Sequence, residues 1–126
     1  MITEDYVSFE TAKLLKEKGF EGRMHTFYTE EGTEMESAYV VPSNFFPIYR
    51  PTLQMAIKWL RDVHDLIISV NFTVHGWLCG ITKIFRDSNG FIVNINHGIG
   101  DDSLPYCDEY EEACEAAIKY CLENLI

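Results

Sequence analysis

The chain has 126 residues, which is enough to bury one substantial core without the help of metals or disulfides. Hydrophobic residues make up 47% of it and charged residues 24%, a globular composition that excludes disordered, collagenous and coiled-coil proteins. With 10 Lys and Arg against 20 Asp and Glu, the formal net charge is −10, which argues against direct binding of nucleic acid through its phosphates.

The first predicted helix covers about residues 9–18. Ser8 is suited to cap its N-terminus, and Gly19 is typical of a helix that ends on a left-handed residue. Two short strands are expected after this helix, at about residues 24–29 and 37–42.

The stretch from Pro42 to Pro51 contains three prolines, which disfavour regular secondary structure. Its aromatic side chains require burial, either across the edge of the core or against another chain. Because clustered exposed aromatic residues mark interaction surfaces, this loop is a candidate interface. The aromatic residues concerned are Phe45, Phe46 and Tyr49.

Thr52 is the expected N-cap of a second helix that runs to about residue 63. At about 100° per residue, its apolar side chains fall on one continuous arc. That arc consists of Leu53, Ala56, Ile57, Trp59, Leu60 and Val63.

After this helix the hydrophobic period changes to two. Ile68 to Val74 alternate with polar residues and predict a half-buried strand, followed by a two-residue turn at His75-Gly76. A partner strand is expected at residues 77–86 and, after a turn at 87–90, a third at 91–97. These three strands form an antiparallel meander.

The last helix is expected to begin at Asp108, which forms a capping box with Glu111. Glu115 and Lys119 are expected to pair on its outer face. The element order αββ-αβββ-α predicts a two-layer α+β fold, with three helices on one face of a mainly antiparallel sheet and a single domain over residues 1–126. The predicted core includes Leu53, Ile57, Leu60, Ala113, Ala117 and Cys121.

The start of the sequence lacks the basic and apolar regions of a signal peptide, and no apolar run approaches the ~20 residues of a membrane span. We therefore expect a cytoplasmic protein without membrane association. The cysteines lack metal-ligand spacing and are expected to be reduced core residues, with no disulfide, zinc or other cofactor. They are Cys79, Cys107, Cys114 and Cys121.

The histidines offer one alternative with catalytic chemistry. His97 precedes a glycine-containing loop with Asp101 and Asp102, and Cys107 follows it. A small hydrolase or transferase that uses His97 with a nearby Asp or Cys is therefore the enzymatic alternative. His64, near a helix C-terminus, is placed where the helix dipole favours a protonated imidazole.

The acidity is concentrated in residues 91–126, which contain eight acidic residues and one basic residue. This region is either a solvated face or a surface for a basic partner, including mimicry of nucleic-acid phosphates towards a DNA-binding protein. The candidate surface comprises Asp101, Asp102, Glu111, Glu112 and Glu115.

Three segments carry a resemblance to a known family. They are VSFETAKLLKEKGF at 7–20, PTLQMAIKWLR at 51–61 and YEEACEAAIKYCLENLI at 110–126. They resemble a family of small uncharacterised proteins from gut Bacteroidales bacteria and their phages. The resemblance implies an accessory protein, of phage or mobile-element origin, and supplies no catalytic residues.

The sequence as a whole favours an acidic, non-enzymatic binding protein that acts through macromolecular contacts. Its expected partner is another protein or a second copy of the same chain in a homodimer. The alternatives to this interpretation are the small enzyme that uses His97 and the mimic of nucleic-acid phosphates.

Overall fold

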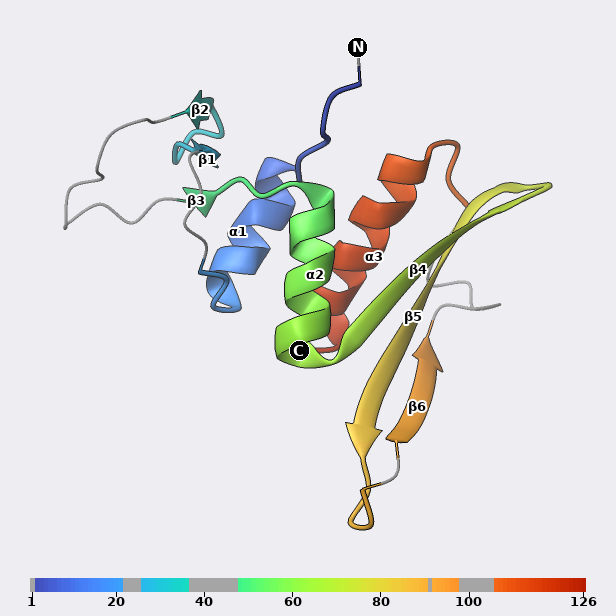
Figure 1. The fold of residues 1–126 in the computed structure, drawn as a ribbon. Helices are drawn as coiled ribbons and strands as arrows, with labels where there is room; N and C mark the ends of the chain where they lie inside the picture. Colours follow the sequence, from blue (N-terminus) through green and yellow to red (C-terminus); the bar gives the residue numbers. More distant parts are fainter. Residues whose placement is uncertain (1, 22–25, 37–47, 91, 98–105) are drawn as a thin grey trace.

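The computed structural model describes residues 2–21, 26–36, 48–90, 92–97 and 106–126, with the backbone alone at 92–97. Its helices are α1 (Phe9–Glu17), α2 (Leu53–His64) and α3 (Tyr110–Asn124). Its strands are β1 (Thr26–Tyr28), β2 (Glu34–Glu36), β3 (Ile48–Tyr49), β4 (Leu66–Thr73), β5 (Gly76–Arg86) and β6 (Ile92–His97). The predicted α+β class is confirmed (Figure 1).

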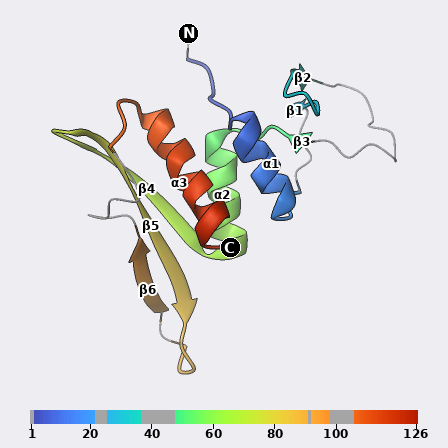
Figure 2. The ribbon, with the colours of Figure 1, turned by 180° about the vertical axis from the view of Figure 1, so that it is seen from behind.

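The strands form two antiparallel sheets in place of the one sheet expected. The small sheet has the order β2-β1-β3, and the long sheet has the order β4-β5-β6. Helix α3 packs on β4 and β5 and also contacts both other helices, whereas α1 packs on α3 and β3. Figure 2 shows the same arrangement from behind, with α1 on the side of the small sheet.

β3 lies in the proline-rich stretch for which the sequence predicted no regular structure, so that prediction was wrong. Prolines flank the strand without interrupting it, and the Arg50 N–H donates to the Thr26 carbonyl at 3.0 Å. Tyr49 is half-buried and packs against the core. Phe45 and Phe46 lie outside the described residues, as does the strand expected at 37–42.

The first two helix starts follow the predicted capping chemistry. The Ser8 hydroxyl accepts a hydrogen bond from the Thr11 N–H, and the Thr52 hydroxyl accepts one from the Met55 N–H, both at 3.2 Å. The third start was predicted wrongly. Glu109, not Asp108, occupies the N-cap position of α3, and its side chain makes no capping hydrogen bond.

One cluster of buried side chains draws on all three helices and both sheets. All six core residues predicted from the sequence are buried within it. Val63 was predicted wrongly and is 58% exposed. It lies about 60° around the helix from Leu60, at the edge of the apolar arc and in the last turn of α2.

The β4–β5 hairpin turns one residue earlier than expected. Thr73 pairs with Gly76, so Val74 and His75 are the turn residues. Gly76 has φ +119, and a Cβ atom there would lie 2.7 Å from the Cys107 carbonyl oxygen. The glycine is therefore needed at the first strand position, where the chain before α3 approaches β5.

Helix α2 gives the first stability prediction. Leu60→Ala removes a fully buried side chain and should lower the free energy of unfolding by about 2–5 kcal/mol. Val63→Ala, on the same helix but exposed, should change it by less than about 0.5 kcal/mol. Urea unfolding measures both, and equal losses would contradict the placement of the helix.

The hairpin gives the second prediction. Gly76→Ala should cost about 2–4 kcal/mol, because the new Cβ meets a backbone carbonyl and the left-handed φ is strained. Gly19→Ala is the matched control, since Gly19 has φ +89 but nothing within 4 Å of the added Cβ. It should lose only about 1 kcal/mol in the same urea titration, and an equal loss in both variants would refute the close contact.

Candidate functional site

An extended N-terminal segment, residues 3–8, is fixed across the start of α2. The Val7 N–H donates to the Pro51 carbonyl at 3.0 Å, and the Leu53 N–H donates to the Asp5 carbonyl at 2.9 Å. The Tyr28 hydroxyl adds a hydrogen bond of 2.6 Å to the Val7 carbonyl. These bonds hold the segment between the small sheet and α3.

A cleft of about 620 Å³ lies between the N-terminal segment, the small sheet and α3. A second hollow of about 190 Å³ also borders Glu4, Asp5 and Glu111. The charged lining of the cleft is mainly acidic, with two cations, Arg50 and Lys119. Its acidic residues are Glu4, Asp5, Glu34, Glu111, Glu112 and Glu115.

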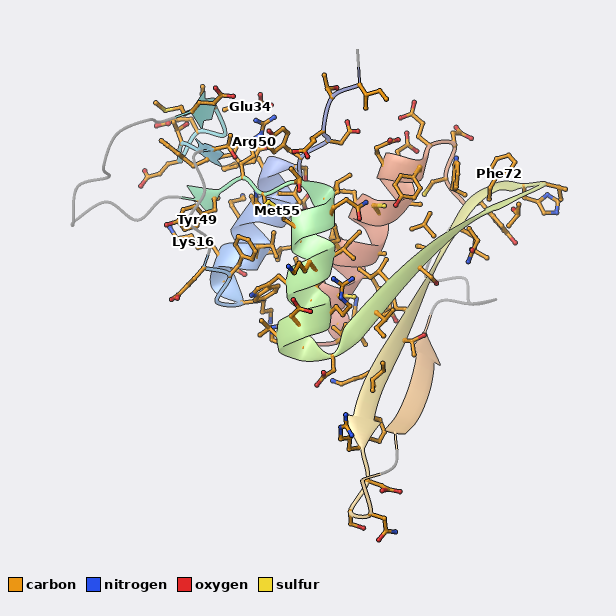
Figure 3. All side chains as sticks on the ribbon, in the orientation of Figure 1. Lys16, Glu34, Tyr49, Arg50, Met55 and Phe72 are labelled. Carbon is orange, nitrogen blue, oxygen red and sulfur yellow. The ribbon has the colours of Figure 1, made fainter. Side chains whose placement is uncertain are left out.

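Arg50 is held by contacts that combine charge and aromatic stacking. Its guanidinium carbon lies 4.0 Å from the centre of the Tyr6 ring and 5.7 Å from that of Tyr28. Its Nη2 lies 3.3 Å from Glu34 Oε2, and its side chain is 15% exposed. Figure 3 shows Arg50 and Glu34 close to each other beside the small sheet.

Glu115 and Lys119 do not form the outward-facing pair expected from their spacing, because α1 packs against this side of α3. Glu115 Oε1 accepts hydrogen bonds from the Ser8 N–H at 3.0 Å and the Thr11 hydroxyl at 2.6 Å. Lys119 Nζ lies 3.0 Å from Glu10 Oε1, and this hydrogen bond raises the pKa of Lys119. Both charges therefore join α1 to α3.

Four carboxylates of the cleft remain without a cation. Within the described residues, no ion pair involves Glu4, Asp5, Glu111 or Glu112. The two cations of the cleft are already paired, Arg50 with Glu34 and Lys119 with Glu10. The uncompensated charge of the cleft is thus negative, and it comes from the N-terminal segment and the start of α3.

Of the acidic surface expected from the sequence, Glu111, Glu112 and Glu115 line the cleft, and Glu115 is also bonded to α1. Asp101 and Asp102 lie outside the described residues. Sequence reasoning missed Arg50, Glu34 and the acidic pair Glu4-Asp5. The adjacent acids Glu4 and Asp5 were the one signal visible in the sequence. The contact of Arg50 with Tyr6 joins residues far apart in the chain and exists only in the folded structure.

Of the enzymatic alternative, the described residues include only the pair of His97 with Cys107, since Asp101 and Asp102 lie outside them. His97 and Cys107 both pair with residues of β5, His97 with Ile81 and Cys107 with Trp77. Four strand residues correspond to about 13 Å, which separates the backbones of the proposed Cys–His pair. Burial also raises the pKa of the Cys107 thiol, so its nucleophilic thiolate form is disfavoured.

The remaining thiols are buried core groups, and His64 is half-buried at the end of α2. Burial raises the pKa of Cys79 and Cys114, and it raises that of Cys121 to about 12. The helix dipole favours a protonated His64, but the surroundings of the ring on balance act in the opposite direction. Burial, followed by the nearby charge of Lys83, lowers its pKa, and the ring lies edge-on to Trp59 at 4.7 Å between centroids.

The described residues contain no group of three or more His, Cys, Asp or Glu side chains arranged to hold a metal ion. In the same part of the chain, no helix has the length and apolar character needed to cross a bilayer. Comparison with protein-family models, with curated proteins and with solved structures gave no match.

The contact between α3 and α1 gives a stability prediction. Glu115→Ala should lower the free energy of unfolding by about 1–3 kcal/mol, because the Thr11 hydroxyl and the Ser8 N–H lose their acceptor. The control is Glu112→Ala, which removes the same type of side chain three positions away at an exposed site. It should change the free energy of unfolding by less than about 0.5 kcal/mol. Urea unfolding at neutral pH would refute the contact if the two variants were equally stable.

Proposed function

We propose that this protein is a non-enzymatic binding module that holds a basic segment of a protein partner in the acidic cleft. The observation that carries the proposal is the set of uncompensated carboxylates from two separate parts of the chain. A Lys or Arg side chain that enters the cleft gains a favourable charge interaction there. The resident cations, already paired with Glu34 and Glu10, compete only weakly for these carboxylates.

The form of the cleft favours an extended organic cation over a bound metal ion. Metal ions require several ligand atoms at one point, and the described carboxylates are not gathered in that way. A cleft of about 620 Å³ is instead of the size that accommodates a few residues of a peptide. Its aromatic and aliphatic lining, including Tyr6 and Leu53, suits the methylene stems of basic side chains.

This proposal keeps the expected cytoplasmic accessory role and a basic protein as partner. Mimicry of nucleic-acid phosphates is one way in which such a partner could be recruited. Self-association remains a separate proposal, for which the aromatic residues Phe45 and Phe46 were the motivation.

A charge-neutral double variant tests the cleft. Glu111→Gln with Glu112→Gln should weaken the binding of an acetylated tetralysine amide by about tenfold at low salt, since each removed pair contributes up to ~1 kcal/mol. Isothermal titration calorimetry measures the affinity of the folded variant and of the wild type. Because the contacts are electrostatic, the wild-type affinity should also fall as salt is added.

The matched control removes the same charge elsewhere. Glu30→Gln with Glu31→Gln changes two exposed carboxylates in the turn between β1 and β2, outside the cleft. This control should bind the peptide about as tightly as the wild type. Equal weakening in both double variants, or no measurable binding to the wild type, would overturn the proposed site.

A further inference from the structure

The cleft contains one cation whose hydrogen-bonding capacity is only partly used. A guanidinium carries five N–H donors in a rigid fork, and a carboxylate that fits the fork accepts two of them in parallel. The ion pair of Arg50 with Glu34 joins one nitrogen, Nη2, to one oxygen at 3.3 Å. Arg50 Nε is buried and has no hydrogen-bond partner. The fork of Arg50 is therefore not filled by Glu34.

The position of Arg50 is fixed by the fold, independently of Glu34. Its ring contacts with Tyr6 and Tyr28 hold the guanidinium against the N-terminal segment. The backbone of Arg50 is also fixed by Thr26. The Arg50 N–H donates to the Thr26 carbonyl, and the Thr26 hydroxyl donates to the Arg50 carbonyl. The guanidinium is therefore preorganised, and the protein loses little conformational entropy when a ligand binds to it.

Glu34, by contrast, is a replaceable partner. Its side chain is 63% exposed and projects from the short strand β2. On the Glu34 side the pair is open to solvent, where salt screens the attraction and the held side chain loses conformational freedom, so Glu34 gains little from the contact. A carboxylate from a ligand can take the place of Glu34 on Arg50 at small cost.

Building on the proposed function, we infer that Arg50 is a carboxylate-binding point of the cleft, and that the ligand is a peptide with a basic side chain and a free C-terminal carboxylate. The basic side chain lies against Glu111 and Glu112, and the carboxylate replaces Glu34 on the fork of Arg50.

Two probes distinguish this inference from attraction by net charge. One is the acetylated peptide Ac-Lys-Ala-Lys with a free carboxylate, and the other is the same peptide as its C-terminal amide. The amide has one more net positive charge, so an acidic cleft without an anion-binding point prefers the amide. Recognition by Arg50 reverses that order, and the wild type should bind the carboxylate form about tenfold more tightly.

Glu34→Gln sharpens the test without altering a buried residue. Removal of the competing carboxylate should strengthen binding of the carboxylate peptide several-fold and widen its advantage over the amide. Glu36→Gln is the matched control, because Glu36 lies two residues along the same exposed strand and does not line the cleft. It should leave the ratio of the two affinities unchanged.

Arg50→Gln completes the set, with its folding checked by circular dichroism because Arg50 also holds Tyr6. The folded variant should lose the preference for the carboxylate form. If the variant does not fold, the response to Glu34→Gln decides the inference.

The outcomes separate the two proposals. Equal binding of the two peptides, or a preference for the amide in both the wild type and Glu34→Gln, overturns the role of Arg50 and leaves the basic-peptide cleft intact. Absence of binding by both peptides overturns the proposed function together with this inference.

Discussion

The structure depends on the close approach of α3 to every element around it. The buried face of this helix is built largely from small side chains, Ala113, Cys114, Ala117 and Cys121, all fully buried. Small side chains let helices and strands come near one another without leaving voids. The long sheet, α1 and α2 can therefore all contact one helix, which a face of large residues would keep apart.

That packing also determines where charge is placed. α1 lies along the side of α3 that carries Glu115 and Lys119, so these residues are bonded to the first helix. A carboxylate near the start of a helix is stabilised, because the positive end of the helix dipole lies there. Glu111 lies one turn nearer the start of α3, and it lines the cleft with Glu112. One helix face thus supplies both a structural ion contact and a wall of the acidic cleft.

Local patterns in the sequence predicted the fold well where the relevant partners are near in the chain. The caps at Ser8 and Thr52 and the apolar arc of α2 depend on residues three or four apart. The caps were confirmed, and the arc was confirmed except in the last turn at Val63. β3 and the inward orientation of Glu115 depend on partners more than twenty residues away. Helical periodicity cannot show whether a polar side chain on the outer face will meet solvent or another helix.

The candidate site was predicted less fully than the fold, for the same reason. The acidic start of α3 was visible as a local excess of charge at Glu111 and Glu112. The stack of Arg50 on Tyr6 was not, because it requires the N-terminal segment to lie beside the chain between β3 and α2. Charge excess suggests a class of partner, whereas the geometry of the cleft depends on long-range contacts.

The staggered register of the long sheet divides β5 into two parts with different partners. β4 pairs with residues 76–83 and β6 with residues 81–86, so the three strands lie side by side only over residues 81–83. The first part of β5 pairs with β4 and packs against α3, with Cys79 and Ile81 fully buried. Beyond residue 83, a two-stranded ribbon continues past the helices, and two strands alone are marginally stable in water (Figure 1). We therefore expect the backbone amides of this ribbon to exchange through local opening, at a lower free energy than global unfolding.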